Sequence, residues 1–493
     1  MRSATDGSKE RTEAVGSVLG GRPHEPQSGP EMVTARRRPK GVIRRAPGLF
    51  AAKLTRHELP ITIFLVFLLL FPNSGSWLAL AAIPFLWALR WTQHRRLTVR
   101  TPVDIPLLVI LIMLLVTFYA TAVFSLTWVA LCQLLAGIAL FYTLVNCLRS
   151  GEGLLTSGKG LVLVGAGLAI LAPLSTKWTT DKVFSLPQVY GHLLTLLPET
   201  MHPNVLAGAL VMVIPISVAL LLYTPSPERA WIGWLRGKGW IALALGGMVI
   251  TLILTQSRGA YLALVAALLV VCTPRFRWML ALVALLAIAF SLALARFGPG
   301  PIMEGLFTTG ALGGWEGRRE VWSRAIYMIQ DFPYTGIGLG TFSRVAPVMY
   351  PYFLLGPDAD VPHAHNLFLQ VAVDLGIPGL LAFLALFFGS IVMAWQGYRK
   401  FRLTDEQALA GVALGLLGSL TAILVHGMVD SVSWGAKPAI IFWVVMALCA
   451  VVHRLALEKV TLPLEEARTT RPGQDIKSPL ERGVNHHFGH SVG

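Results

Sequence analysis

Charge is scarce in this chain of 493 residues. Charged residues make up 14% of the sequence and hydrophobic residues 54%, and the mean hydropathy is +0.63. These values exclude the set of soluble domains that the length alone would suggest, and they are typical of a protein that crosses a membrane many times. Acidic residues are the scarcest charged group, with 26 Asp and Glu against 41 Lys and Arg.

The resulting net charge of +15 could indicate nucleic-acid binding. However, the basic residues concentrate in the N-terminal tail and in short links between apolar segments. The positive-inside rule predicts that distribution for a membrane protein. We therefore expect membrane lipids, and no nucleic acid, among its partners.

Cysteine is also rare, and an early apolar segment is missing. The four cysteines (Cys132, Cys147, Cys272 and Cys449) lie in or beside apolar segments without metal-type spacing, so we interpret them as small core side chains and infer no disulfide framework. Residues 1–57 are polar and Arg-rich, which argues against a cleavable signal peptide. We expect residues 1–57 and 454–493 to be disordered cytoplasmic tails.

Apolar runs occupy most of the remaining chain. About twelve of them could span a bilayer, nine within 58–296 and three within 379–453. The runs lie at 60–72, 76–90, 105–125, 127–148, 160–174, 204–223, 238–256, 259–273, 276–296, 378–396, 406–427 and 436–453. The sequence thus predicts an all-α integral membrane protein.

The links between the runs predict its orientation. With the N-terminus in the cytoplasm, the basic clusters within 90–100, 149–159, 229–238, 275–277 and 399–402 all fall on the cytoplasmic side. Both termini are then cytoplasmic, and residues 297–378 form a large extracytoplasmic loop. Because that loop is rich in Arg, His and Asn, we expect it to be catalytic.

Arginines at the outer surface are the first candidates for chemistry. Arg258 separates two apolar runs, and Gly259 permits a tight turn beside it. Arg318 and Trp322 share one face of a predicted amphipathic helix, and the same helix contains Arg319. A guanidinium at the lipid surface can bind a phosphate or pyrophosphate in a bidentate manner. The alternatives are a membrane anchor for Arg258 and a solvated helix face for Arg318.

Histidines in the loop are the second candidates. His363 and His365 precede Asn366 and Asp374. Histidine is the natural general base near neutral pH, Asn366 either caps the next helix or orients a substrate, and Asp374 orients a base or the loop. Two histidines at this spacing could also bind a metal, but no carboxylate or cysteine cluster accompanies them in the sequence. We therefore expect no metal.

Two more pairs reach the same predicted face. His202 and Asn204 begin the sixth run, and His426 and Asp430 end the eleventh, where they form either a structural pair or support for the site. The glycine run at 336–340 could be mistaken for a nucleotide-binding loop. It follows a helix and lies outside the cytoplasm, so we predict a flexible turn instead.

Several motifs resemble a known family. They are SRGAY at 257–261, GRREVW with SRAIYMIQDFPYTGIGLGTF at 317–342, and HAHNLFLQVAVDLGIPG at 363–379, supported by HPNVLAGAL at 202–210 and HGMVD at 426–430. In this order they resemble the O-antigen ligase family over roughly residues 200–450. The resemblance implies a GT-C-like membrane glycosyltransferase of the bacterial cytoplasmic membrane. Such an enzyme takes a glycan from undecaprenyl pyrophosphate to an acceptor hydroxyl of a lipid or glycan, without a metal or other cofactor.

The resemblance also implies roles for individual residues. Arg258 and Arg318 correspond to the arginines that bind the pyrophosphate, and His365 corresponds to the histidine that activates the acceptor. Asp374 stands where many relatives have glutamate. Substrate binding is expected for the other candidates: Arg319, Trp322, His363, Asn366, Asp374, His202, Asn204, His426 and Asp430.

The family leaves alternatives open. It includes polysaccharide polymerases, which use a growing glycan as acceptor, protein O-glycosyl ligases, and proteins once proposed as bicarbonate transporters. A transporter is expected to carry ionisable residues in the middle of its spans, which these runs lack.

Overall fold

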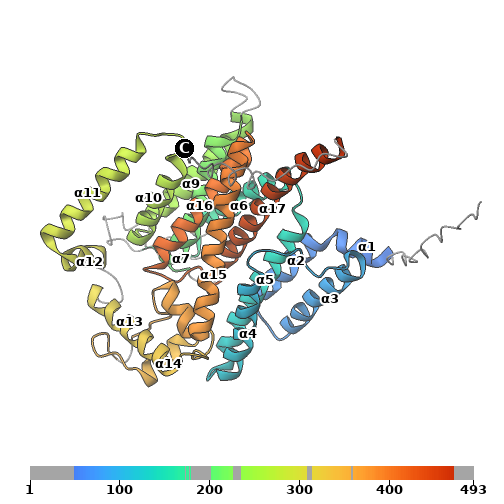
Figure 1. Cartoon of the computed structure of the whole chain (residues 1–493). Coiled ribbons are helices and arrows are strands. Elements are labelled where there is room, and N and C mark those ends of the chain that lie inside the picture. The colour runs from blue at the N-terminus through green and yellow to red at the C-terminus, as the bar shows by residue number, and fades with distance from the viewer. Residues whose placement is uncertain are drawn as a thin grey trace, which may run out of the picture. The chain divides into compact units, whose positions relative to one another are not determined.

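The computed structural model of the chain describes residues 49–171, 174–176, 178, 201–225, 235–307, 314–356 and 359–470. These residues form helices and, apart from one bridge between Thr176 and Met201, no β-structure (Figure 1). The helices are α1 (Leu49–Arg56), α2 (Glu58–Leu70), α3 (Ser76–His94), α4 (Asp104–Ala120), α5 (Phe124–Cys147), α6 (Gly151–Leu171), α7 (Pro203–Tyr223), η3 (Leu235–Gly239), α9 (Trp240–Leu254), α10 (Arg258–Cys272), α11 (Met279–Phe297), α12 (Pro299–Phe307), α13 (Gly314–Asp331), α14 (Phe342–Met349), α15 (Leu367–Leu403), α16 (Gln407–Gly427) and α17 (Ala439–Thr470).

Every predicted apolar run coincides with a helix. Among the described residues, eight helices are long and apolar enough to cross a membrane, namely α5, α6, α7, Gly237–Leu254, α11, α15, α16 and the first part of α17. The apolar helices α2, α4 and α10 are shorter. The membrane class is therefore supported, whereas twelve crossings and a GT-C-like fold stay predictions.

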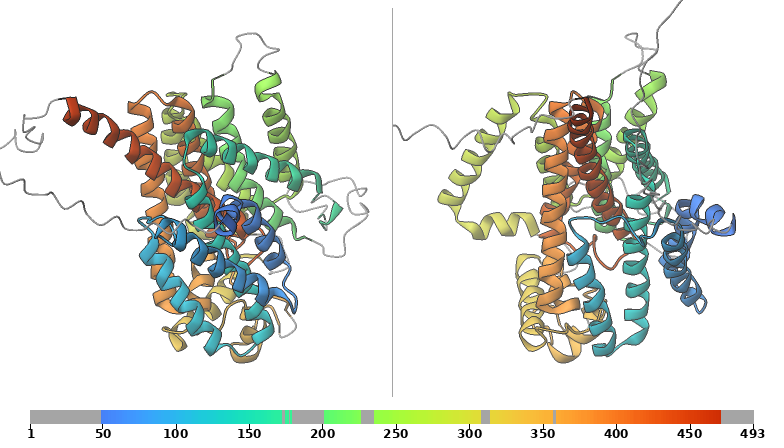
Figure 2. Two further views of the ribbon diagram at one scale, coloured as in Figure 1. Left: turned by 90° about the vertical axis from the view of Figure 1, so that its right-hand side faces the viewer. Right: turned by 45° about the vertical axis from the view of Figure 1, so that its right-hand side comes forward.

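Helices α7, α10, α15, α16 and α17 form the core, with α4 and α5 packed against α15 and α17 (Figures 1 and 2). Small residues allow this close approach. A Cβ at Gly415 in α16 would lie 2.9 Å from the Cα of Ile216 in α7, and one at Gly418 would lie 2.6 Å from Val271 in α10. Helices in membranes associate through such small-residue contacts, since apolar burial alone gives little preference for protein over lipid.

The segment between α11 and the middle of α15 is largely helical and has its own core. Val321, Ala325 and Met328 of α13 pack with residues of α14 and with Val373 of α15. This cluster is separate from the membrane core. Gly376 (φ 68) kinks α15 close to the predicted end of the loop at 378. The predicted loop is thus a small packed unit that includes the first part of α15.

The helix links form two groups at opposite helix ends. In the first, Thr117 of α4 donates to the Asp374 carbonyl (2.7 Å), and Gly259 after the α9–α10 link packs against Val429 of the α16–α17 link. We call this group the site end. In the second, the α3–α4 link contacts the end of α5, and the start of α16 contacts the end of α7. We call this group the basic end, because it carries the arginine-rich links. The grouping agrees with the predicted alternation of the spans.

The predicted boundaries of the two tails differ from the structure wherever the structure describes those residues. Helix α17 continues to Thr470, past the predicted boundary at 453, because Leu455 and Ala456 remain buried and Arg454 donates to the Val145 carbonyl (2.6 Å). Helix α1 lies inside the predicted N-terminal tail and packs against α3. Residues 1–48 and 471–493 lie outside the described residues.

Candidate active site

Two histidines and one aspartate meet at the site end. Nε2 of His363 lies 3.5 Å from Oδ1 of Asp430, and Nδ1 of His365 lies 4.0 Å from the same oxygen. The two imidazole rings are 4.2 Å apart between centroids. Asp430 is almost fully buried, and 12% of the His365 side chain is exposed. The link after α16 therefore supplies a carboxylate to the histidines that precede α15.

The local sequence folds the histidines into this position. Asn366 caps α15, with its side-chain oxygen accepting from the backbone of Phe368 and Leu369 at 3.0 Å. Its amide group donates to the Met428 carbonyl at 3.1 Å, which ties the start of α15 to the end of α16. His365 adopts a left-handed backbone (φ 48), a conformation disfavoured for a residue with a side chain. Of its two predicted roles, Asn366 clearly performs the capping.

Arg318 reaches the same link from α13. Its guanidinium donates to the Val429 carbonyl at 2.6 Å, adjacent to Asp430. Burial lowers the pKa of Arg318, and the Asp430 carboxylate acts in the opposite direction. An arginine retains its charge under such a shift, so a partly buried cation lies next to the cluster.

Arg258 approaches from another side. It begins α10, and its neighbour Gly259 packs so closely on Val429 that a Cβ there would lie 2.5 Å from the valine side chain. The start of α10, which carries Arg258, and the Arg318 guanidinium therefore border the same short link. The predicted tight turn is present, because Gln256 before it has a left-handed backbone (φ 51).

The site favours a neutral His365. Burial and the neighbouring His363 lower the pKa of His365 to about 3, although Asp430 acts in the opposite direction. Burial also lowers the pKa of His363. For Asp430, burial opposes ionisation, but the surrounding imidazoles outweigh it and hold the pKa below its ordinary value. At neutral pH the site thus contains an ionised carboxylate next to a neutral His365.

The structure changes the basis of the metal prediction. The sequence indicated no carboxylate near the two histidines, but His363, His365 and Asp430 place ligand-type atoms within 4.8 Å of one another. Two imidazoles and a carboxylate form a ligand set known from metal sites. Arg318, which interacts electrostatically with Asp430, adds a fixed positive charge that disfavours a cation there.

His202, Asn204 and His426 lie on the helices next to this cluster. The ring of His202 caps α7 by accepting from the Asn204 backbone (3.2 Å), and His202 is one of the residues that interact electrostatically with His365. His426 is buried in α16 against Gly208 of α7 and Gly259 of α10. His426 therefore packs the helices that carry the site.

Asp374 belongs to a different network. Its carboxylate accepts from Gln370 (2.9 Å), from the Gly340 backbone (3.2 Å) and from the Trp434 indole (3.0 Å). These bonds occupy both carboxylate oxygens. Of the roles proposed from the sequence, Asp374 fulfils that of orienting the loop.

The glycine run is a packed turn, and the prediction of a flexible turn was wrong. Gly336, Gly338 and Gly340 all have positive φ. A Cβ at Gly336 would lie 2.4 Å from the Asp374 carbonyl oxygen, and one at Gly338 would lie 2.6 Å from Thr121. Only glycine fits both the backbone conformation and this close approach.

Two other predicted site residues, Arg319 and Trp322, contact neighbours within α13 and, among the residues that the structure describes, no member of the cluster. Arg319 forms an exposed ion pair with Glu316 (3.1 Å). Trp322 packs edge-on against Trp315 with centroids 5.7 Å apart, and its buried indole nitrogen has no hydrogen-bond partner within the described part of the chain. The two neighbouring arginines therefore lie on different faces of α13: Arg318 contacts the Val429 carbonyl, and Arg319 is exposed.

Sequence reasoning missed Glu320. Its carboxylate accepts from the backbone of Phe353 (2.5 Å), Leu354 (3.1 Å) and Leu355 (3.1 Å) and pairs with Arg324 (3.3 Å). Burial would raise the pKa of Glu320, but these contacts lower it. A glutamate on the buried face of an amphipathic helix was the available signal. Glu320 fixes the segment that covers the loop core.

Comparison with known proteins gives one result that bears on this site. Residues 241–384 match the family model described as O-antigen ligase, a range that contains Arg258, Arg318 and His365. Asp430 and His202 fall outside it. No curated protein gives a significant sequence match. The resemblance found in the motifs is thereby confirmed over this range.

Proposed function

We propose that this protein is an O-antigen ligase-type glycosyltransferase. It moves a glycan from an undecaprenyl-pyrophosphate carrier to an acceptor hydroxyl on the extracytoplasmic side of the bacterial cytoplasmic membrane. The observation that carries the proposal is the position of the largely buried His365, next to Asp430 and to the link that the Arg318 guanidinium and the start of α10 border. One proton acceptor and two cations are the groups that this transfer requires.

His365 is the proposed general base. The acceptor oxygen bonds to the anomeric carbon of the donor sugar while the bond from that carbon to the pyrophosphate oxygen breaks. The electron pair leaves with undecaprenyl pyrophosphate, and the acceptor proton passes to Nε2 of His365. Nδ1 faces Asp430 at 4.0 Å, and this distance should shorten as the imidazolium forms. An anionic donor beside His365 would raise its pKa towards the range useful at neutral pH.

Arg318 and Arg258 are proposed to bind the pyrophosphate. Pyrophosphate is a good leaving group that needs positive charge as it departs, and preorganised charges in a site contribute a few kcal/mol. Arg318 is preorganised because Val429 and the Asp430 charge hold its guanidinium. No metal is required for this step in the proposal.

Deletion of the gene tests the proposal in cells. Undecaprenyl-linked glycan should accumulate in the deletion strain, and the wild-type gene should reverse the accumulation, whereas a stably inserted His365→Ala variant should not. Unchanged lipid-linked glycan would contradict the proposal. The length of the surface product distinguishes the superfamily alternatives, because a ligase adds one unit and a polymerase makes a ladder.

A further inference from the structure

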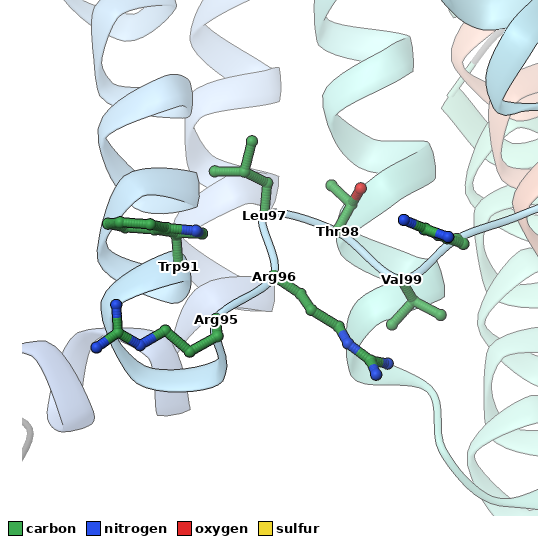
Figure 3. Close-up of a pocket in the computed structure, with 7 residues that line it drawn as sticks. Trp91, Arg95, Arg96, Leu97, Thr98 and Val99 are labelled. Atoms are coloured by element: carbon green, nitrogen blue, oxygen red, sulfur yellow. The ribbon is translucent and has the colours of Figure 1, made fainter. Parts of the chain in front are cut away.

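A pocket at the basic end has the properties of a lipid-binding site. The link between α3 and α4 borders an open pocket of about 710 Å³, which is lined by Trp91, Arg95, Arg96, Leu97, Thr98, Val99 and Arg100 (Figure 3). In Figure 3, Arg95 extends below the Trp91 ring and Arg96 projects away from it. The pocket lies at the helix ends opposite to the candidate active site, so it is independent of glycan transfer.

Hydrogen bonds fix the backbone that forms the pocket. The Val99 backbone donates to the side chain of Asn146 in α5 at 2.9 Å. Thr101 donates to the Asp104 carboxylate through both its backbone (3.0 Å) and its hydroxyl (2.6 Å). Arg95 ends α3 in a left-handed conformation (φ 55), with its backbone bonded to the Trp91 carbonyl. These bonds hold the arginine-bearing link in one arrangement.

Three positive charges line the pocket without a neutralising acid. Within the described residues, no ion pair joins Arg95, Arg96 or Arg100 to a carboxylate. The nearby acid Glu58 is paired with Arg90 at 2.6 Å, and both of those side chains are buried. Asp104 is occupied by Thr101 and Tyr142. The pocket therefore favours an anion.

Apolar side chains border the same cations. Trp91 is 49% exposed and Leu97 52% exposed, and the Arg95 guanidinium lies 5.5 Å from the centroid of the Trp91 ring. Along α3, the apolar side chains of Trp77, Leu78 and Phe85 are also exposed. An apolar helix surface thus leads to a cationic pocket flanked by tryptophan. A phospholipid has the matching order of groups, from apolar acyl chains to an anionic headgroup.

We infer that the α3–α4 link binds the phosphate headgroup of an anionic membrane lipid. The three arginines contact the phosphate, and Trp91 and Leu97 contact the adjoining glycerol and acyl groups. The exposed apolar groups distinguish this ligand from free phosphate, which has no apolar part to place there.

Native mass spectrometry of the full-length protein in neutral detergent tests the inference. The test variant is Arg95→Gln/Arg96→Gln/Arg100→Gln. The control is Arg275→Gln/Arg277→Gln/Arg399→Gln, which removes the same charge from exposed positions in the α10–α11 link and near the end of α15. Each variant is titrated with phosphatidylglycerol and with phosphatidylcholine, and its thermal midpoint without lipid verifies folding.

The wild type and the control should bind phosphatidylglycerol in preference to phosphatidylcholine. The test variant should lose roughly 100-fold in phosphatidylglycerol affinity, since each arginine near an anionic lipid contributes roughly five-fold. Trp91→Leu should weaken binding less. Equal losses in test and control, or wild-type binding in a folded test variant, would overturn the inference. Displacement of the lipid by millimolar inorganic phosphate would do so too, because it would indicate a free-phosphate site. If the triple variant does not fold, Arg96→Gln alone must still reduce binding by about five-fold.

Discussion

The two ends of the helical unit use arginine in opposite ways. At the site end, Arg318 is largely buried and its guanidinium bonds to the Val429 carbonyl beside Asp430. At the basic end, Arg95, Arg96 and Arg100 are exposed on a link. A buried charge requires fixed partners, whereas an exposed charge keeps its hydration. The number of basic residues therefore does not locate the chemistry, but their burial and partners do.

The site end also contains most of the constrained backbone. His365, Gly336 and Gly376 have positive φ, and the Glu320 and Asp374 carboxylates are bonded to backbone or indole N–H groups. Such constraints are concentrated where a geometry has to be maintained. Substitutions at the site end should therefore have larger effects than matched substitutions elsewhere in the protein.

The largest effect is expected at His365. Replacing His365 with alanine removes the proposed base and should lower glycan transfer by about 10²–10⁴-fold. His57→Ala, an exposed histidine before α2 at the basic end, is the control and should retain wild-type transfer. Transfer is measured as loss of the lipid-linked donor in membranes with equal amounts of each variant. Wild-type activity in His365→Ala would refute the assignment of the base.

Arg318 comes next. Arg318→Ala should reduce transfer by about 10²–10³-fold, because a preorganised cation is lost from the leaving group. Arg344→Ala, an exposed arginine in α14 of the same loop, is the matched control. Single-turnover rates with saturating donor are the appropriate measurement. If both variants lose activity equally, the contrast between buried and exposed arginines does not hold.

A glycine substitution in the packed turn of the site end should lower stability more than one at an open position of a helix. Gly336→Ala places a Cβ against the Asp374 carbonyl at positive φ and should destabilise the protein by roughly 1–3 kcal/mol. Gly160→Ala in α6, where a Cβ meets nothing within 4 Å, should be neutral or slightly stabilising. Thermal unfolding in detergent measures both. A neutral Gly336→Ala would mean that the turn is as flexible as the sequence suggested.

The smallest effect concerns pH. Folding lowers the pKa of His365 from 6.5 to about 3, so between these values the unfolded chain binds more protons at this site. Stability should therefore fall as the pH decreases through this window. His365→Gln should lose less stability than the wild type between pH 6.5 and 4. Parallel curves for the two proteins would show that His365 is not held neutral by the fold.

The helices could be predicted well from the sequence. Apolar runs separated by basic links predicted the membrane helices, and the amphipathic pattern around Arg318 and Trp322 predicted α13. The extension of α17 was missed because its polar composition conceals the contact of Arg454 with α5. Local pattern determines helix formation, whereas the end of a helix depends on tertiary contacts.

The site could be predicted only in part. Arg258, Arg318 and His365 were identified by type, position and resemblance. Asp430 was a candidate, but its contact with His363 joins the start of α15 to the end of α16. Such a contact depends on how the helices pack and cannot be read from the local sequence. The Val429 carbonyl is a backbone group with no signature in the sequence. Asp374 and Asn366 are polar residues beside the histidines, and only their hydrogen bonds show that they support structure.

Reconstitution tests the central claim most directly. Purified protein is inserted into liposomes with an undecaprenyl-pyrophosphate-linked glycan and a hydroxyl acceptor, without added metal, and both the glycosylated acceptor and released undecaprenyl pyrophosphate are quantified. The account predicts stoichiometric formation of the two products by the wild type and their absence with His365→Ala. Product formation by His365→Ala, or none by folded wild-type protein with several acceptors, would contradict it.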